Sequence, residues 1–302
     1  MTLPESVRLC DAVELAAIAL QKPLFDKDLT KQFFPGLPPA DAEGDIKNVF
    51  ALAKARLAAA PIGYPFTVTG HSIVFQQPPD FNVYAFLLLG RALEFGGPAQ
   101  ADELLRNFRR FFEDVVSWSL RKSGFASEVL SEPRGFRGLD IQLEPALREI
   151  SNRFREAAIL RVDRLLPGDN DLDVDVLAVP IVGNGSRGGW PIIQIQCATG
   201  AVKHLEAKLG EGEGTFGTVW ESGFFPGSRI RAVATPDDLL KLDDVHWLRL
   251  GQAGWVLDRT RIAYLSSTNR AIPLLNEVTA YWGDLWAARV DIDWQTGWQQ
   301  VA

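Results

Sequence analysis

The chain has 302 residues, of which 47% are hydrophobic and 23% are charged, so it contains enough apolar material for one large domain or two ordinary ones. Its formal net charge of -7 at pH 7 argues against broad, sequence-independent affinity for nucleic acid, because that affinity comes from many Lys and Arg contacts to phosphates. The two cysteines, Cys10 and Cys197, lie far apart in the sequence, which excludes a CxxC metal motif and a disulfide framework.

The first twenty residues, MTLPESVRLCDAVELAAIAL, carry acidic residues within an apolar run and have no basic leader, so we do not expect a signal peptide. No uninterrupted apolar run reaches the roughly 18 residues that a membrane helix needs. We therefore expect a cytoplasmic protein with no membrane partner. The three histidines, His71, His204 and His246, are too widely separated in sequence to support a His-rich metal site or a His-based nucleophile triad.

The first part of the chain is predicted to be mainly helical. A capping-box spacing predicts a helix that begins at Asp11, and apolar residues at helical spacing predict a second helix over 46–57. Alternating apolar and polar residues over 64–75 predict a short hairpin. The nearly all-apolar segment 80–95 predicts a buried helix, and the apolar stripe that follows predicts a longer one over 104–124.

The loop SEPRGFRGLD at 131–140 contains two glycines, a proline and two arginines, and it is the predicted domain boundary. We expect a mainly helical regulatory or recognition domain over 1–140 and an α/β domain with a mixed β-sheet over 141–302. The elements expected in the second domain are a helix over 144–164, two strands within 166–200, a helix through 209, a strand SRIRAVAT, a short helix PDDLLKL, strands HWLRL and RIAYLSS, and a last helix over 272–288.

Two motifs do not fit the chemistry that they suggest. The segment GEGTFGTV at 212–219 matches the glycine-rich loop of protein kinases, but no HRD-type catalytic loop and no DFG follow it, so we predict a flexible loop. The acidic ladder at 169–175 has the alternate carboxylates of an EF-hand, but Val174 and Pro180 stand where that loop requires Gly and Glu.

A different set of polar residues lies on the two expected strands. In DLDVDVLAV, the alternation of an extended chain places Asp173 and Asp175 on one face. In WPIIQIQCATG, it places Gln194 and Gln196 together, and an unpaired buried amide costs roughly 1 to 3 kcal/mol. Asp173, Gln196 on the next strand and a nearby basic residue would form an oxygen-lined pocket that holds Mg²⁺ against a phosphate.

This order of motifs resembles the PD-(D/E)xK restriction-endonuclease-like superfamily, in which an Asp begins one strand and a (D/E)xK tripeptide lies on the next. The segments GDNDLDVDVLAV, IIQIQCATG, HLEAKL and DRTRI are similar to a branch of defence-associated nucleases. The resemblance implies that Asp173 is the metal-binding aspartate and that Gln196 occupies the position of the second acid. Ala198 occupies the lysine position, so the resemblance implies that Lys208, or next Lys203, supplies the ammonium group.

Two functions follow as hypotheses. The first is a Mg²⁺-dependent DNA endonuclease of antiphage defence, with Mn²⁺ as a substitute cation and RNA as the alternative substrate. Its expected partners are a defence protein bound by the helical domain and, as an alternative, a second copy of the chain. The second is a nuclease-like scaffold or DNA-binding subunit that has lost its chemistry. Alternative interpretations stay open for single residues: the glutamines could lie on the exposed face of an edge strand, and Asp173 could be a loop carboxylate.

Overall fold

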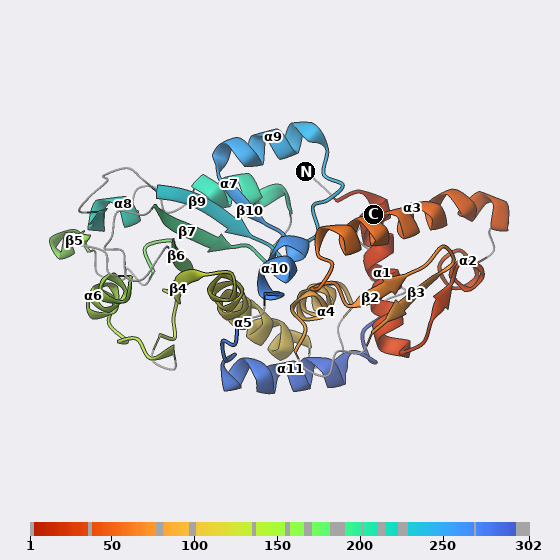
Figure 1. Ribbon diagram of the computed structural model, residues 1–302, viewed down its shortest axis with the longest axis horizontal. Helices are drawn as coiled ribbons and strands as arrows, with labels where there is room; N and C mark the ends of the chain where they lie inside the picture. The colour runs from red at the N-terminus through yellow and green to blue at the C-terminus, as the bar shows by residue number, and fades with distance from the viewer. Residues whose placement is uncertain are drawn as a thin grey trace.

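The computed structural model describes residues 3–35, 38–76, 81–96, 101–134, 137–154, 158–165, 171–181, 191–200, 202–210, 215–222, 229–268 and 270–293. Within these ranges the fold is mixed α/β, with a helical amino-terminal region followed by a five-stranded mixed sheet (Figure 1). This arrangement confirms the expected mixed α/β class with a helical amino-terminal region, and the restriction-endonuclease-like type of core stays a prediction.

The amino-terminal region contains helices and a small sheet. Its helices are α1 (Glu5–Leu20), α2 (Asp26–Phe33), α3 (Pro39–Ala59), α4 (Val83–Gly96) and α5 (Ala101–Lys122). Strands β1 (Leu24–Phe25), β2 (Phe66–Val68) and β3 (Ser72–Phe75) form an antiparallel sheet in the order β1-β3-β2. The predicted hairpin is confirmed, and it corresponds to β2 and β3.

The central sheet has the strand order β10-β9-β7-β6-β4. Its strands are β4 (Phe125–Val129), β6 (Val176–Pro180), β7 (Ile192–Cys197), β9 (Arg229–Ala234) and β10 (Trp255–Leu257). Strand β6 runs antiparallel to both of its neighbours, whereas β7, β9 and β10 are mutually parallel. The carboxyl ends of β7, β9 and β10 therefore lie at one edge of the sheet, and the start of β6 lies at the same edge.

The remaining elements surround this sheet. They are α6 (Leu143–Arg153), β5 (Ala158–Leu160), a 3₁₀ turn at Val162–Arg164, a 3₁₀ turn at Val202–His204, α7 (Leu205–Gly210), α8 (Thr215–Val219), β8 (Trp220–Ser222), α9 (Asp244–Ala253), α10 (Arg259–Ser266) and α11 (Asn276–Ala288). Strands β5 and β8 pair as a separate two-stranded sheet. Figure 1 shows α7 and α9 on one side of the central sheet and α5 on the other.

The two faces of the central sheet pack against different helices. Ile195 of β7 and Ala232 of β9 belong to the hydrophobic cluster that also contains residues of α4, α5 and α10. On the opposite face, Val233 packs with Leu205 and Leu209 of α7. Because Gln196 pairs in register with Val233, Gln196 lies on the face that α7 covers.

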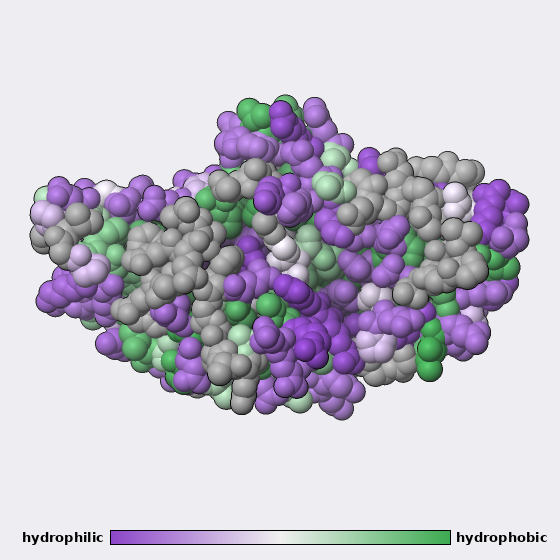
Figure 2. All heavy atoms as spheres, turned by 180° about the vertical axis from the view of Figure 1, so that it is seen from behind, coloured by the Kyte–Doolittle hydropathy of each residue, from purple (hydrophilic) through white to green (hydrophobic). Residues whose placement is uncertain are grey.

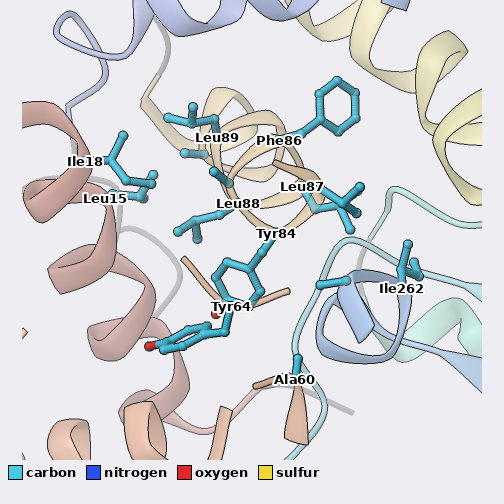
Figure 3. Close-up of a cluster of buried hydrophobic side chains, with 14 of the residues drawn as sticks. Leu15, Ile18, Ala60, Tyr64, Tyr84, Phe86, Leu87, Leu88, Leu89 and Ile262 are labelled. Atoms are coloured by element: carbon cyan, nitrogen blue, oxygen red, sulfur yellow. The ribbon is translucent and has the colours of Figure 1, made fainter. Parts of the chain in front are cut away.

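Helices from both halves of the chain share one core. Figure 3 shows Leu15 of α1, Leu88 of α4 and Ile262 of α10 around the same cluster of buried side chains. Strand β4, which precedes residue 140, is one of the two edge strands of the central sheet. The proposed division into units 1–140 and 141–302 concerns independent folding, and it stays a prediction.

A buried ionic network joins the amino-terminal helices to the carboxyl edge of the sheet. The network consists of Asp11, Glu14, Arg56, Asp238 and Arg259. Arg56 of α3 lies 2.6 Å from Asp11 and 2.8 Å from Glu14, and it also pairs with Asp238, which follows β9. Arg259, which follows β10, pairs with Asp11. Charged side chains therefore fix the position of the helical region relative to the ends of two strands.

Several predicted elements of the second half are wrong. The segments HWLRL and RIAYLSS form helices α9 and α10, not strands, because Asp243 and Asp258 act as N-caps and accept the backbone N–H groups of His246 and Arg261. The helix predicted over 144–164 ends at Arg153, and PDDLLKL forms turns instead of a helix. Residues 215–219 of the predicted flexible loop form α8, and residues 211–214 lie outside the described ranges.

Among the described residues, none of the helices combines the length and the apolar character that crossing a membrane requires. Hydrophilic residues cover most of the coloured surface seen from behind (Figure 2). Helix α9 forms the projection at the top of that view, and its side chains include the exposed Val245 and Leu248.

Candidate functional site

The two glutamines of β7 are buried on a central strand. Gln194 is 6% exposed and Gln196 is 7% exposed. Their strand, β7, lies between β6 and β9 in the sheet. The Nε2 atom of Gln194 has no hydrogen-bond partner among the described residues. This placement excludes the interpretation in which both amides lie on the exposed face of an edge strand.

Asp173 and Lys208 lie in different environments. Asp173 is exposed in the turn before β6, and its backbone N–H donates to Oδ1 of Asp171 at 3.0 Å. Lys208 is half-buried on α7, the helix that covers the Gln196 face of the sheet. The structure thus brings Gln196 and the helix carrying Lys208 to one face, whereas Asp173 lies outside the sheet.

The backbone before β6 does not follow the alternation that the sequence predicted. Leu172 and Asp173 both have a φ of 57°, in the left-handed region that non-glycine residues rarely adopt. Because these two residues interrupt the extended chain, Asp173 does not share a strand face with Asp175, and that part of the prediction is wrong. Strand β6 begins at Val176, so the aspartate that directly precedes the strand is Asp175.

Asp175 connects the start of β6 to the end of β7. Its Oδ2 atom accepts the backbone N–H of Cys197 at 2.6 Å, one residue beyond Gln196. The backbone N–H of Asp175 donates to the carbonyl of Ile195 at 3.1 Å. The half-buried carboxylate of Asp175 is therefore held at the carboxyl end of β7.

A second carboxyl group lies near Asp175, on α5. Burial, and then the negative charge of Asp175, raise the pKa of Glu113 from its ordinary value of 4.5 to about 8. Ser131, which follows β4, donates its hydroxyl to Glu113, and Arg137 lies 3.6 Å from Oε2 of Glu113. We call Glu113 and Asp175 the acidic pair.

The thiol of Cys197 lies in the field of the acidic pair. Burial raises the pKa of Cys197 well above its ordinary value, and the negative charges of Asp175 and Glu113 raise it further. This thiol is therefore protonated at neutral pH and is a poor nucleophile. The environment favours a cation at this position instead of cysteine chemistry.

Glu113 was missed by sequence reasoning. In the sequence, Glu113 lies within the helix predicted over 104–124, directly before Asp114. The neighbouring Asp114 is buried and binds Arg137 through two hydrogen bonds of 2.8 and 3.0 Å. Two acids on a helix stripe that is otherwise aromatic and apolar were the available signal, since carboxylates are buried only when they are paired or bind cations.

The donor atoms fit a hard divalent cation. Carboxylate oxygens of the acidic pair are ligand types that Mg²⁺ and Mn²⁺ accept. Within the part of the chain that the structure describes, no group of three or more His, Cys, Asp or Glu side chains has a metal-binding arrangement. Gln196 lies on the α7 face and Glu113 on α5, which covers the opposite face, so a cation held by the acidic pair would complete its coordination with water.

Comparisons of the chain with protein-family models, with curated proteins and with solved structures found no match. The resemblance to PD-(D/E)xK nucleases therefore rests on the sequence motifs alone and stays a prediction.

Proposed function

We propose that the protein is a Mg²⁺-dependent DNA endonuclease with the PD-(D/E)xK type of core. The observation that carries the proposal is the placement of Asp175 at the start of β6, with its carboxylate bound to the strand end that follows Gln196. The PD-(D/E)xK motif has an aspartate at the start of one strand and a polar residue on the next strand, and Asp175 and Gln196 follow this order. Asp175 fits this order better than Asp173, because Asp173 lies in a turn outside the sheet.

Each residue has a defined role in the proposed chemistry. Asp175 and Glu113 would hold the cation, which would neutralise charge on a phosphate and lower the pKa of a bound water. Gln196 lies on the face that α7 covers, where its amide group would bind the phosphate together with Lys208. Lys208 would place an ammonium group near the reacting phosphate, where it stabilises developing negative charge.

Ala198 stands where the PD-(D/E)xK motif has its lysine, and its surroundings favour an ammonium group that comes from another position in the chain. Ala198 is 7% exposed and packs in the hydrophobic cluster that contains Leu205 and Leu209 of α7. A lysine at this position would have to bury its charge among apolar side chains, at a high cost in free energy. A cation supplied from α7 avoids that cost.

The remaining parts of the proposal concern partners and place. DNA is the proposed substrate, with RNA as the alternative, and the helical region is the proposed site for a defence partner or a second copy of the chain. The proposed setting is the cytoplasm of a cell under phage attack. The second candidate, an inactive nuclease-like scaffold, draws support from the absence of both the acid and the lysine of the tripeptide at Gln196 and Ala198.

Plasmid cleavage with Mg²⁺ or Mn²⁺ separates the two candidates. We expect nicking or cutting by the unaltered protein, and loss of that activity in Asp175→Asn and in Lys208→Ala. Lys54→Ala is the matched control, because Lys54 is exposed on α3 and should leave the rate unchanged, whereas Lys203→Ala tests the alternative donor. Absence of cleavage with either cation, together with absence of Mn²⁺ binding, would favour the scaffold.

A further inference from the structure

Arg91 of α4 reaches from the helical region to the ends of two neighbouring strands. Its Nε atom donates to Oδ1 of Asp237, which follows β9, at 2.7 Å. Its Nη1 atom donates to the carbonyl oxygen of Thr199, which follows β7, at 3.2 Å. One side chain therefore bridges the carboxyl ends of β7 and β9.

Acidic side chains orient this guanidinium group. Arg91 pairs with Glu94 on its own helix and with Asp237, and the Arg91 side chain is only 10% exposed. Burial raises the pKa of Asp237, and the positive charge of Arg91 opposes that rise. The charged partners leave the guanidinium with little freedom to turn, so the donation to Thr199 has a fixed direction.

Thr199 belongs to the segment that separates two proposed site residues. It lies between Gln196 on β7 and Lys208 on α7, and residue 200 is exposed. The backbone N–H of Ala198 still donates to the carbonyl of Ala234, so the hydrogen bonding between the strands continues to Ala198. Beyond this point, the Arg91 contact ties the segment to the helical region.

We infer that Arg91 is a positioning residue that couples α4 to the segment joining Gln196 and Lys208. The inference rests on the proposed function for its catalytic consequence, because it assumes that these two side chains act on one phosphate. The contact with Thr199 fixes where the chain leaves the sheet, and this exit point determines where α7 places its lysine. A change in the helical region would reach the site through this contact.

The test uses Arg91→Lys, which keeps the positive charge near Asp237 but cannot donate to both partners at once with the planar geometry of arginine. The matched control is Arg109→Lys. Arg109 of α5 lies 3.6 Å from the same Glu94, and its side chain is 56% exposed. Hydrogen exchange of peptides covering 198–209 is compared with exchange of peptides from β6 in each variant.

We expect Arg91→Lys to speed exchange over 198–209 about tenfold and to leave β6 unchanged, because only a local tether is lost. Plasmid cleavage should fall by about tenfold in kcat, with the KM for DNA unchanged, since the defect is one of placement. Arg109→Lys should change neither the exchange over 198–209 nor the kcat of plasmid cleavage. Unchanged exchange over 198–209, or faster exchange across the whole sheet, would overturn the inference. If the unaltered protein does not cleave DNA, the proposed function fails, and the exchange measurement still decides the role of Arg91.

Discussion

Arg56 is the central cation of the buried ionic network, and replacing it by methionine should destabilise the protein strongly. Its side chain and those of Glu14 and Asp238 are 0% exposed, so the substitution leaves two fully buried carboxylates without their cation. Tyr64 and Tyr84 donate hydrogen bonds to Glu14 at 2.6 and 2.8 Å, which compensates that charge only in part. Figure 3 shows these two tyrosines beside the core shared by α1, α4 and α10.

Removing one partner of a buried ion pair costs about 3 to 5 kcal/mol. Unfolding entropy of roughly 2.1 cal/mol/K per residue gives about 0.6 kcal/mol/K for 302 residues. The melting temperature of Arg56→Met should therefore fall by about 5 to 8 °C.

Urea unfolding measures the loss in the free energy of unfolding, and calorimetry measures the fall in melting temperature. The matched control is Arg148→Met, because Arg148 pairs with Glu144 at 2.9 Å on the surface of α6, where the two side chains are 56% and 43% exposed. That exposed pair should contribute no more than about 0.5 kcal/mol. A loss of less than about 1 kcal/mol in Arg56→Met would refute the reasoning, because an uncompensated buried charge must cost more than this.

Three further predictions concern other parts of the molecule. Burial is the main cause that raises the pKa of Asp258 from its ordinary 3.8 to about 6. Between these two pH values the folded protein keeps a proton on Asp258 that the unfolded chain has lost. Stability should therefore fall by on the order of 1 to 3 kcal/mol as the pH rises from about 4 to 6, and urea titrations of Asp258→Asn should show a flatter profile over that window. Gly90→Ala places a Cβ 2.1 Å from the Phe108 ring and should destabilise the folded protein by about 1 to 3 kcal/mol. In Gly44→Ala the new Cβ lies on a helix and meets nothing within 4 Å, so this substitution should stabilise the protein by up to about 1 kcal/mol. Calorimetry of both variants checks the contrast. The raised pKa of Cys197 predicts slow alkylation by iodoacetamide at pH 8 in the folded protein and fast alkylation in urea, measured by mass spectrometry; fast reaction without urea would contradict it.

The strands that position the site were predictable because their sequences are short apolar runs between turn residues. Strands β6, β7 and β9 lie within the segments expected from those runs. Helices α9 and α10 were not predictable in the same way, because an apolar run of about five residues fits a strand or a buried helix equally well. The capping residues Asp243 and Asp258 carried the missing information.

The site was only partly visible in the sequence for two physical reasons. Aspartate tolerates a positive φ better than most residues, so nothing in the alternating run DLDVDV marked Asp173 as the residue that leaves the extended conformation. Glu113 approaches Asp175 only because α5 packs against the sheet, and a contact between residues so far apart in sequence leaves no local pattern. Gln196 was found because two amides within an apolar strand demand a partner.

The most direct test of the proposed site is calorimetric titration of the protein with Mn²⁺, with Asp175→Asn and Asp173→Asn in parallel. The account predicts that the unaltered chain binds the cation, that Asp175→Asn loses binding, and that Asp173→Asn keeps it, because Asp173 lies exposed in the turn outside the sheet. Binding by Asp175→Asn as tight as that of the unaltered chain would contradict the assignment of the acidic pair as a cation site.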